Sequence, residues 1–164
     1  MKRLVVVFLL LSAAAAAPAQ PVVFIVRHAE KAATGGSDPD LSPAGQARAD
    51  TLAQMLKDSG IVSIFTSEFK RTKETAAPTA KSLGITPTIV PGKDTAALVS
   101  KLRELKGNAL VVGHGNIIPD LVKTLGINTP VQIDENDYSQ VFVVILGDKP
   151  QLLRLRYPTW ASFS

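Results

Sequence analysis

Both histidines of this chain follow short apolar runs, and an arginine precedes the first of them. Residues 22–26 read VVFIV and run directly into Arg27 and His28, while residues 109–112 read ALVV and lead through a glycine to His114. A neutral imidazole is a competent nucleophile toward phosphorus, and a protonated imidazole can stabilise charge on transferring oxygens. The residue types at these two positions therefore point to phosphoryl-transfer chemistry.

A second arginine follows a third apolar run. Residues 61–65 read IVSIF, and Arg71 comes shortly after them, where a helix is expected to begin. Arg27 and Arg71 offer planar pairs of N–H donors that suit phosphate. Predicted helix N-termini near residues 69 and 116 add backbone N–H groups, and Gly115 lets the backbone approach a ligand closely. Together these features predict an anion site that contains two imidazoles.

Two other functions are compatible with these residues. With neighbouring carboxylates, His28 and His114 could hold a metal ion, but Arg27 and Arg71 in the same cleft would repel a cation. We therefore expect neither a metal nor another cofactor. A non-catalytic protein that binds a phosphorylated ligand would need only the arginines, so the presence of both histidines favours an enzyme, and binding alone remains the alternative.

The apolar runs are interpreted as buried strands, because they are β-branched and do not alternate with polar residues. Between them, helices are predicted to begin near residues 43, 69, 94 and 117 and to end by the glycines at 60, 84, 107 and 126. Pro78 is expected to kink or break the second helix. The chain ends in a predicted hairpin that turns at residues 147–148, with Arg154 and Arg156 on an edge strand.

Alternating strands and helices of this kind predict an α/β fold, a three-layer α/β/α sandwich with a mostly parallel, mixed central sheet. Ligands of such sheets bind outside the carboxyl ends of the strands. His28 and His114 both occupy such ends, so they face one cleft if their strands are neighbours. The loops at residues 33–41 and 129–137 are the ones long enough to reach over that cleft.

Three segments, RHAEK, SEFKRTKETA and VVGHGN, resemble the signature segments of the histidine phosphatase superfamily, which includes cofactor-dependent phosphoglycerate mutases and small phosphohistidine phosphatases. The segment DPDLSPAGQARA adds to the resemblance. The resemblance implies that His28 becomes phosphorylated and that Arg27 and Arg71 bind the phosphate together with Gly115. It also implies that His114 is the second catalytic histidine and contacts the phosphate. One departure is Ala29, where the commonest motif of the family has glycine.

The resemblance leaves the general acid open between two carboxyl groups. Asp94 lies in the segment where the resembled mutases place their acid, but it also suits an ordinary helix N-cap. Glu30 could donate the proton or simply form an ion pair with Lys31 or Arg71. We expect a phosphatase that hydrolyses phosphomonoesters or phosphohistidine through a covalent phosphohistidine. The alternative is a mutase-type phosphotransferase, although the resembled mutases carry insertions for which this chain is short.

The first 19 residues have the composition of a secretory signal peptide. Lys2 and Arg3 precede an apolar stretch over residues 4–17, and Ala17 and Ala19 occupy the small-residue positions of a cleavage site. A membrane-spanning helix needs about 20 apolar residues, so cleavage after Ala19 is expected, and a retained anchor is the alternative. The catalytic domain then covers residues 20–164 and is exported to the periplasm or the medium.

The composition of this domain restricts the classes of partner that it is expected to bind. Without Lys2 and Arg3 the formal net charge falls from +4 to +2, and no cluster of basic residues suggests nucleic acid. The chain contains no cysteine, so no disulfide supports it. The expected partner is a phosphorylated small molecule or a phosphoprotein, with no stable membrane insertion after cleavage.

Overall fold

The structure of the protein is a computed structural model that describes residues 20–158. The predicted signal peptide therefore lies outside the described residues. The helices are α1 (Pro43–Leu56), α2 (Lys70–Leu83), α3 (Thr95–Arg103) and α4 (Ile118–Thr124). The strands are β1 (Val22–Arg27), β2 (Ile61–Thr66), β3 (Thr88–Ile89), β4 (Asn108–Gly113), β5 (Gln140–Ile145) and β6 (Gln151–Arg156).

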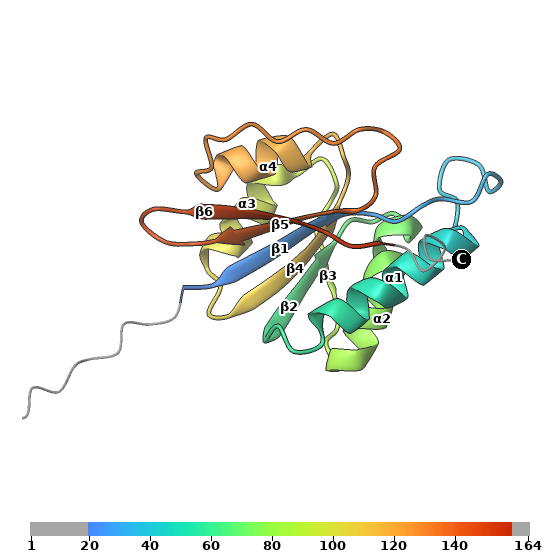
Figure 1. Cartoon of the computed structure of the whole chain (residues 1–164), viewed down its shortest axis with the longest axis horizontal. Coiled ribbons are helices and arrows are strands. Elements are labelled where there is room, and N and C mark those ends of the chain that lie inside the picture. The colour runs from blue at the N-terminus through green and yellow to red at the C-terminus, as the bar shows by residue number, and fades with distance from the viewer. Residues whose placement is uncertain (1–19, 159–164) are drawn as a thin grey trace, which may run out of the picture.

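The strands form one mixed sheet between two layers of helices (Figure 1). Its order is β3-β2-β4-β1-β5-β6, and the first four strands of that order run parallel while β5 and β6 run antiparallel. Leu52 and Leu56 of α1 pack with Leu110 on one face, and Leu102 and Leu121 pack on the other. The predicted three-layer α/β/α sandwich is confirmed.

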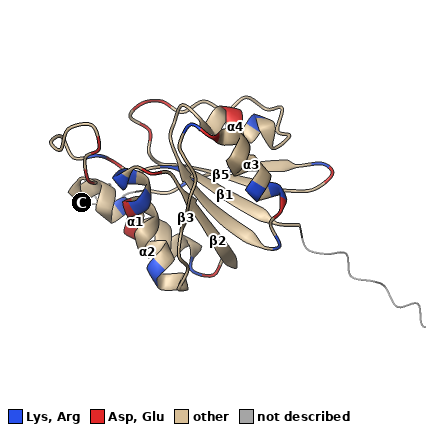
Figure 2. Cartoon of the chain, turned by 180° about the vertical axis from the view of Figure 1, so that it is seen from behind, with Lys and Arg blue, Asp and Glu red and all other residues tan. Residues whose placement is uncertain are grey.

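Charge is almost absent from the middle of the sheet. Figure 2 shows the charged residues on the helices, the loops and the ends of strands. Strands β1, β2 and β4 contain one charged residue among them, Arg27, which is the last residue of β1. An arginine at that point lies where the apolar core ends, so it can face a polar site without a large desolvation penalty.

Local signals predicted most of the elements, and the structure differs from the sequence expectations at two places. The Ser42 side chain caps α1 by accepting a hydrogen bond from the Gly45 amide at 3.1 Å, as predicted. Helix α2, however, continues through Pro78, so the prediction of a break was wrong. Its buried face, which includes Thr75 and Ala76, packs against the rest of the domain, and this packing outweighs one lost backbone hydrogen bond. The short strand β3 was not predicted.

The sheet order brings the two histidine-bearing strand ends together. Strands β1 and β4 are adjacent and parallel, with Arg27 opposite Gly113. The His28 amide continues the ladder by donating to the Gly113 carbonyl at 2.9 Å. His28 and His114 therefore follow the carboxyl ends of two adjacent strands, at the same end of the sheet. The edge position predicted for the last strand is also confirmed, since β6 pairs only with β5 among residues 20–158.

Within residues 20–158, no helix combines the length and the apolar character that crossing a membrane would require.

Candidate active site

The four residues of the predicted site line one cavity of about 410 Å³ at the carboxyl ends of β1 and β4. The lining residues are Arg27, His28, Lys31, Arg71, His114, Gly115, Asn116, Ile133 and Glu135. A larger groove of about 650 Å³ lies near Gln20 and Leu146, but it contains none of the predicted site residues. We place the candidate site in the smaller cavity because the titratable and cationic side chains converge there.

His28 is a buried imidazole with one ring nitrogen hydrogen-bonded and the other without a partner among residues 20–158. It is 5% exposed, and its Nδ1 lies 2.8 Å from the Ala29 carbonyl oxygen. Because a carbonyl oxygen only accepts, Nδ1 carries the proton and Nε2 keeps its lone pair. Burial lowers the pKa of His28 to about 4, and the nearby positive charges of Arg71 and Arg27 act in the same direction. At neutral pH the ring is therefore uncharged and nucleophilic at Nε2.

His114 faces His28 with its ring centroid 5.4 Å away. Its Nε2 lies 2.9 Å from the Ser67 hydroxyl, which lies 2.9 Å from the Thr72 hydroxyl. The Thr72 hydroxyl donates to the Phe69 carbonyl at 2.8 Å, so it accepts from Ser67, and Ser67 in turn accepts from His114. This series of hydrogen bonds assigns the proton of His114 to Nε2 and leaves its Nδ1 as an acceptor.

The pKa of His114 is also lowered to about 4. Burial is the main cause, the positive charge of Arg71 adds to it, and the carboxylate of Glu68 acts against it. Both imidazoles of the cavity are thus neutral near pH 7. A bound dianion would partly cancel the charge of the arginines, and it would favour protonation of His114 at its free nitrogen.

Each arginine of the cavity is held at Nη1. Arg27 donates from Nη1 to the backbone carbonyls of Asp134 at 3.1 Å and Glu135 at 2.6 Å. The Nη1 of Arg71 lies 3.5 Å from a carboxylate oxygen of Asp38. In both arginines the Nε atom is buried and has no hydrogen-bond partner within residues 20–158. Buried donors are rarely left unpaired, and these two Nε groups are donors of the kind that suit an anionic ligand.

Aromatic rings support both guanidinium groups. The Arg27 guanidinium lies 4.3 Å from the ring centroid of Tyr138, and that of Arg71 lies 4.2 Å from the ring of Phe69. Tyr138 also approaches His28, with ring centroids 6.1 Å apart. Sequence reasoning missed Tyr138, because nothing in its local pattern links it to a strand end more than 100 residues earlier.

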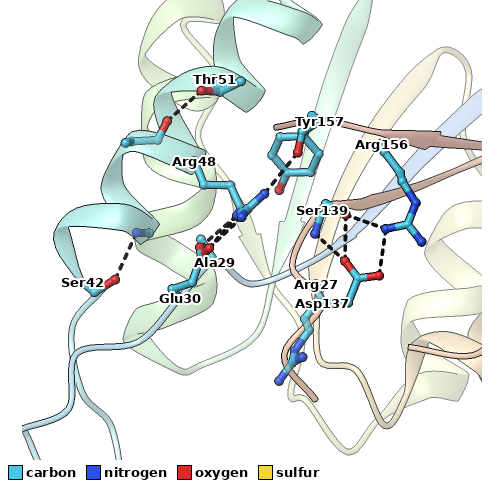
Figure 3. Close-up of polar contacts among 12 residues, drawn as sticks. Arg27, Ala29, Glu30, Ser42, Arg48, Thr51, Asp137, Ser139, Arg156 and Tyr157 are labelled. Carbon is cyan, nitrogen blue, oxygen red and sulfur yellow. Dashed lines mark hydrogen bonds and ion pairs between the residues drawn. The ribbon is translucent and has the colours of Figure 1, made fainter. Parts of the chain in front are cut away.

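Glu30, one of the two acid candidates, forms an ion pair with Arg48 of α1. Its carboxylate accepts from Arg48 Nη2 at 2.7 Å and from Arg48 Nε at 2.8 and 3.0 Å (Figure 3). Burial alone would raise the pKa of Glu30, but the hydrogen bonds and charge of Arg48 outweigh burial and lower it. Glu30 does not line the cavity. An ionised carboxylate with this partner is poorly suited to donate a proton.

Asp94, the other acid candidate, is an exposed helix cap. Its Oδ1 accepts from the Ala97 amide at 2.9 Å at the start of α3, and it does not line the cavity either. The geometry thus matches the N-cap alternative. Among the described residues, Glu135 is the one carboxylate-bearing residue that lines the cavity, and Glu68 lies next to it, accepting from the Gly92 amide at 2.8 Å.

The unusual Ala29 fits its turn without strain. Its side chain is fully buried and packs with Leu41 and Ala49. Its amide donates to the Thr75 hydroxyl at 2.9 Å, and no non-glycine residue among those described has a positive φ. A methyl group at this position therefore ties the His28 turn to α1 instead of crowding it.

No group of three metal-ligating side chains occurs in the part of the chain that the structure describes. The cavity instead combines two neutral imidazoles with two arginines whose free donors point to a doubly charged oxyanion. That combination is chemically suited to bind and transfer a phosphoryl group.

Comparison with known proteins agrees with this chemistry. The family model of the histidine phosphatase superfamily (branch 1) matches residues 23–93, which include Arg27, His28 and Arg71. His114 lies beyond the matched residues, and the structure places it beside His28. The family-model match supports assignment to the histidine phosphatase superfamily.

Solved structures of the same fold include the protein histidine phosphatase SixA complexed with tungstate, which is 22% identical with a TM-score of 0.70. The alignment covers 82% of this chain and 96% of that one. The alpha-ribazole phosphatase of Shigella flexneri is 16% identical (TM-score 0.68; 83% and 96% covered). The phosphoglycerate mutase of Bacillus anthracis is 16% identical (TM-score 0.64; 84% and 94% covered). No curated protein sequence matches the chain.

Proposed function

We propose that the protein is a phosphatase in which His28 forms a covalent phosphohistidine. In the first step the Nε2 lone pair of His28 attacks phosphorus, and the leaving group departs with the electrons of its bond to phosphorus. In the second step water attacks the phosphorus, the N–P bond breaks, and inorganic phosphate is released. The observation that carries the proposal is the neutral His28, with Nε2 free, beside two arginines with unpaired Nε donors.

The other groups of the cavity have supporting roles in this scheme. Arg27 and Arg71 bind the phosphoryl oxygens as bidentate donors, and Gly115 allows the backbone to approach them. A Cβ at residue 115 would lie 3.5 Å from the unpaired Nε of Arg27, where it would compete with the ligand. His114 takes up a proton as the dianion binds, and it then stabilises charge on the transferring oxygens.

The arrangement favours substrates whose leaving group needs no protonated carboxyl group. Neither Glu30 nor Asp94 lines the cavity, and Glu30 is held ionised by Arg48. An alkoxide leaving group needs a proton in the transition state. The imidazole of a phosphohistidine departs as a neutral ring if its other ring nitrogen already carries a proton. We therefore rank phosphohistidine and activated esters above alkyl phosphates. A mutase remains the second candidate, because the structural alignment with the Bacillus anthracis mutase covers 94% of that protein's chain.

A substrate panel tests this proposal. Purified protein with residues 20–164 should hydrolyse a phosphohistidine peptide and p-nitrophenyl phosphate faster than an alkyl phosphate. Quenching a reaction with labelled substrate in alkali should leave label on His28, since phosphohistidine is labile in acid. His28→Ala is the loss-of-function variant, and Arg103→Ala, on the far side of the domain, is the control. Full turnover by His28→Ala, or label on another residue, would contradict the nucleophile assignment.

We also propose that the enzyme works without a metal or another cofactor. Arg27 and Arg71, with Lys31 at the cavity wall, supply positive charge directly. Turnover should survive dialysis against EDTA and should be inhibited by vanadate. A loss of turnover that a divalent ion restores would overturn this proposal.

Export is proposed from the sequence of residues 1–19 alone. Mass spectrometry of the protein from the periplasmic fraction or the medium should find Gln20 as the first residue. An intact Met1 on protein from the soluble cytoplasmic fraction would contradict export and cleavage.

A further inference from the structure

The segment between α4 and β5 passes over the end of β1 and is tied to strand β6. We call residues 129–139 the strap; Figure 1 shows this stretch in orange and red beyond the end of β1. Arg154 donates from Nη2 to the carbonyl oxygen of Pro130 in the strap. Arg156 donates from Nη1 to Asp137 at 3.0 Å and to the Ser139 hydroxyl at 2.8 Å (Figure 3). Two arginines of β6 thus form hydrogen bonds with both halves of the strap.

The spacing of these arginines explains how one strand reaches the strap twice. Residues two apart on a strand point to the same face of the sheet, so Arg154 and Arg156 share a face. The intervening Leu155 and the preceding Leu153 occupy the opposite face, where they are 45% and 48% exposed. The alternation that looked like an ordinary edge strand in the sequence therefore puts the two strap-binding arginines on one face of β6, where both remain exposed to solvent.

Asp137 is the central acceptor of this connection. It accepts from the Ser139 amide at 2.9 Å and from Gln140 Nε2 at 2.8 Å as well as from Arg156. Burial would raise the pKa of Asp137, but these hydrogen bonds outweigh burial and lower it to about 2. Asp137 consequently remains ionised throughout the pH range of enzyme assays, and so does its ion pair with Arg156.

The other side of the strap contacts the cavity. The carbonyls of Asp134 and Glu135 accept from Nη1 of Arg27, and the Tyr138 ring lies against the same guanidinium. With Nη1 occupied by the strap, the edge of the guanidinium formed by Nε and Nη2 is the one left for a ligand. The strap thus determines which edge of Arg27 is presented.

We propose that Arg154 and Arg156 are positioning residues of the candidate active site, which fix the guanidinium of Arg27 for phosphate by holding the strap. This inference rests on the proposed function only in that the cavity must bind a phosphoryl group. It assigns a role in the site to two residues of the edge strand that lie outside the cavity.

Tungstate, an analogue of phosphate, is the probe, with its affinity measured by calorimetry at neutral pH. Arg154→Ala/Arg156→Ala should weaken tungstate binding about threefold to tenfold, because two partly exposed contacts are lost and Arg27 is no longer fixed. Arg156→Lys, which keeps the charge opposite Asp137, should recover part of this affinity. Arg103→Ala is the matched control, since Arg103 also donates to a backbone carbonyl, that of Thr124 at 3.4 Å, but does so far from the cavity.

An epistasis measurement distinguishes positioning from a merely structural role. Arg27→Lys removes the paired N–H donors of the guanidinium. In that background Arg154→Ala/Arg156→Ala should therefore cause little further loss of tungstate affinity. A structural effect would persist in that background and would also lower the urea midpoint of unfolding. Adding Arg156→Ala to Asp137→Asn should likewise cause little further loss of tungstate affinity, because Asp137→Asn already weakens the connection that Arg156 makes.

The outcomes separate this inference from the proposed function. If wild type binds tungstate and the double substitution leaves the affinity within about twofold, the positioning role is overturned while the phosphatase proposal stands. If the affinity falls as expected but no phosphorylated substrate is turned over, the positioning role stands and the phosphatase proposal fails. Absence of tungstate binding by the wild type would overturn both.

Discussion

Lowering the pH from about 8 to about 5 should destabilise this protein through its two histidines. In the folded state the pKa of each imidazole is lowered from 6.5 to about 4, chiefly by burial. The unfolded chain therefore binds protons at a higher pH than the folded one. Above pH 6.5 neither state binds them and stability is unaffected, whereas between pH 6.5 and about 4 each proton taken up favours unfolding.

The size of this effect follows from the two pKa values. For one histidine, a folded pKa of about 4 against an unfolded value of 6.5 costs about 2 kcal/mol at pH 5, and about 3 kcal/mol once the pH is below both values. The pair should cost up to about 4 kcal/mol at pH 5, a large part of the stability of an ordinary domain. The chain has no other histidine and no cysteine, so few other groups titrate in this window.

The assay is urea denaturation followed by circular dichroism at pH 8, 7, 6 and 5, in buffers without phosphate or sulfate, since a bound oxyanion would oppose the effect. His114→Gln should show about half of the wild-type dependence, and His28→Gln/His114→Gln should be nearly flat. Proton NMR titration gives the two pKa values directly, because only two imidazole signals exist. Equal stability at pH 8 and 5, or an equally steep loss in the double variant, would refute the reasoning.

Substitutions at three further positions test how the site is supported. Gly45→Ala should destabilise the fold by about 2 kcal/mol despite the better helix former, because a Cβ there would overlap the backbone carbonyl of Glu30; an unchanged urea midpoint would contradict this close packing. Glu30→Gln should cost about 2 kcal/mol by leaving the buried Arg48 without its counter-charge, a figure reduced from that of a fully buried pair. If its main effect were instead a loss of turnover on alkyl phosphates with unchanged stability, Glu30 would be the acid after all. Asp94→Ala should cost about 1 kcal/mol through loss of the helix cap, while Asp94→Asn keeps the cap and should change neither stability nor turnover; slower turnover by Asp94→Asn would restore the acid assignment.

Much of the architecture could be predicted because it depends on local patterns. Apolar β-branched runs bounded by turn residues predict buried strands, and Ser42 with its following proline predicts the start of α1. Each site residue of the family motif lies just after such a run or at a helix start, so its place at the end of a strand or the beginning of a helix could also be predicted. The α/β class and the sandwich followed from these signals, whereas the family was suggested by the resemblance of three sequence segments.

Local patterns do not say which distant residues meet. Helix α2 passes through Pro78 because its buried face packs on the sheet, a stabilisation that no local propensity contains. The roles of the carboxylates were equally undetermined: Glu30 turned out to face Arg48, and Asp94 to cap α3. In each case the chemistry of the side chain allowed several partners, and packing selected one of them.

The sequence by itself determined the reactive groups of this protein, namely two imidazoles and two arginines at strand and helix ends. Only the tertiary structure decided how those groups behave. The adjacency of β1 and β4 brings the rings to 5.4 Å, and burial keeps both neutral. The edge of Arg27 that is left for a ligand depends on carbonyls 107 and 108 residues away. Hydrogen bonds and desolvation act through space, so their effects depend on contacts that the order of residues along the chain does not specify.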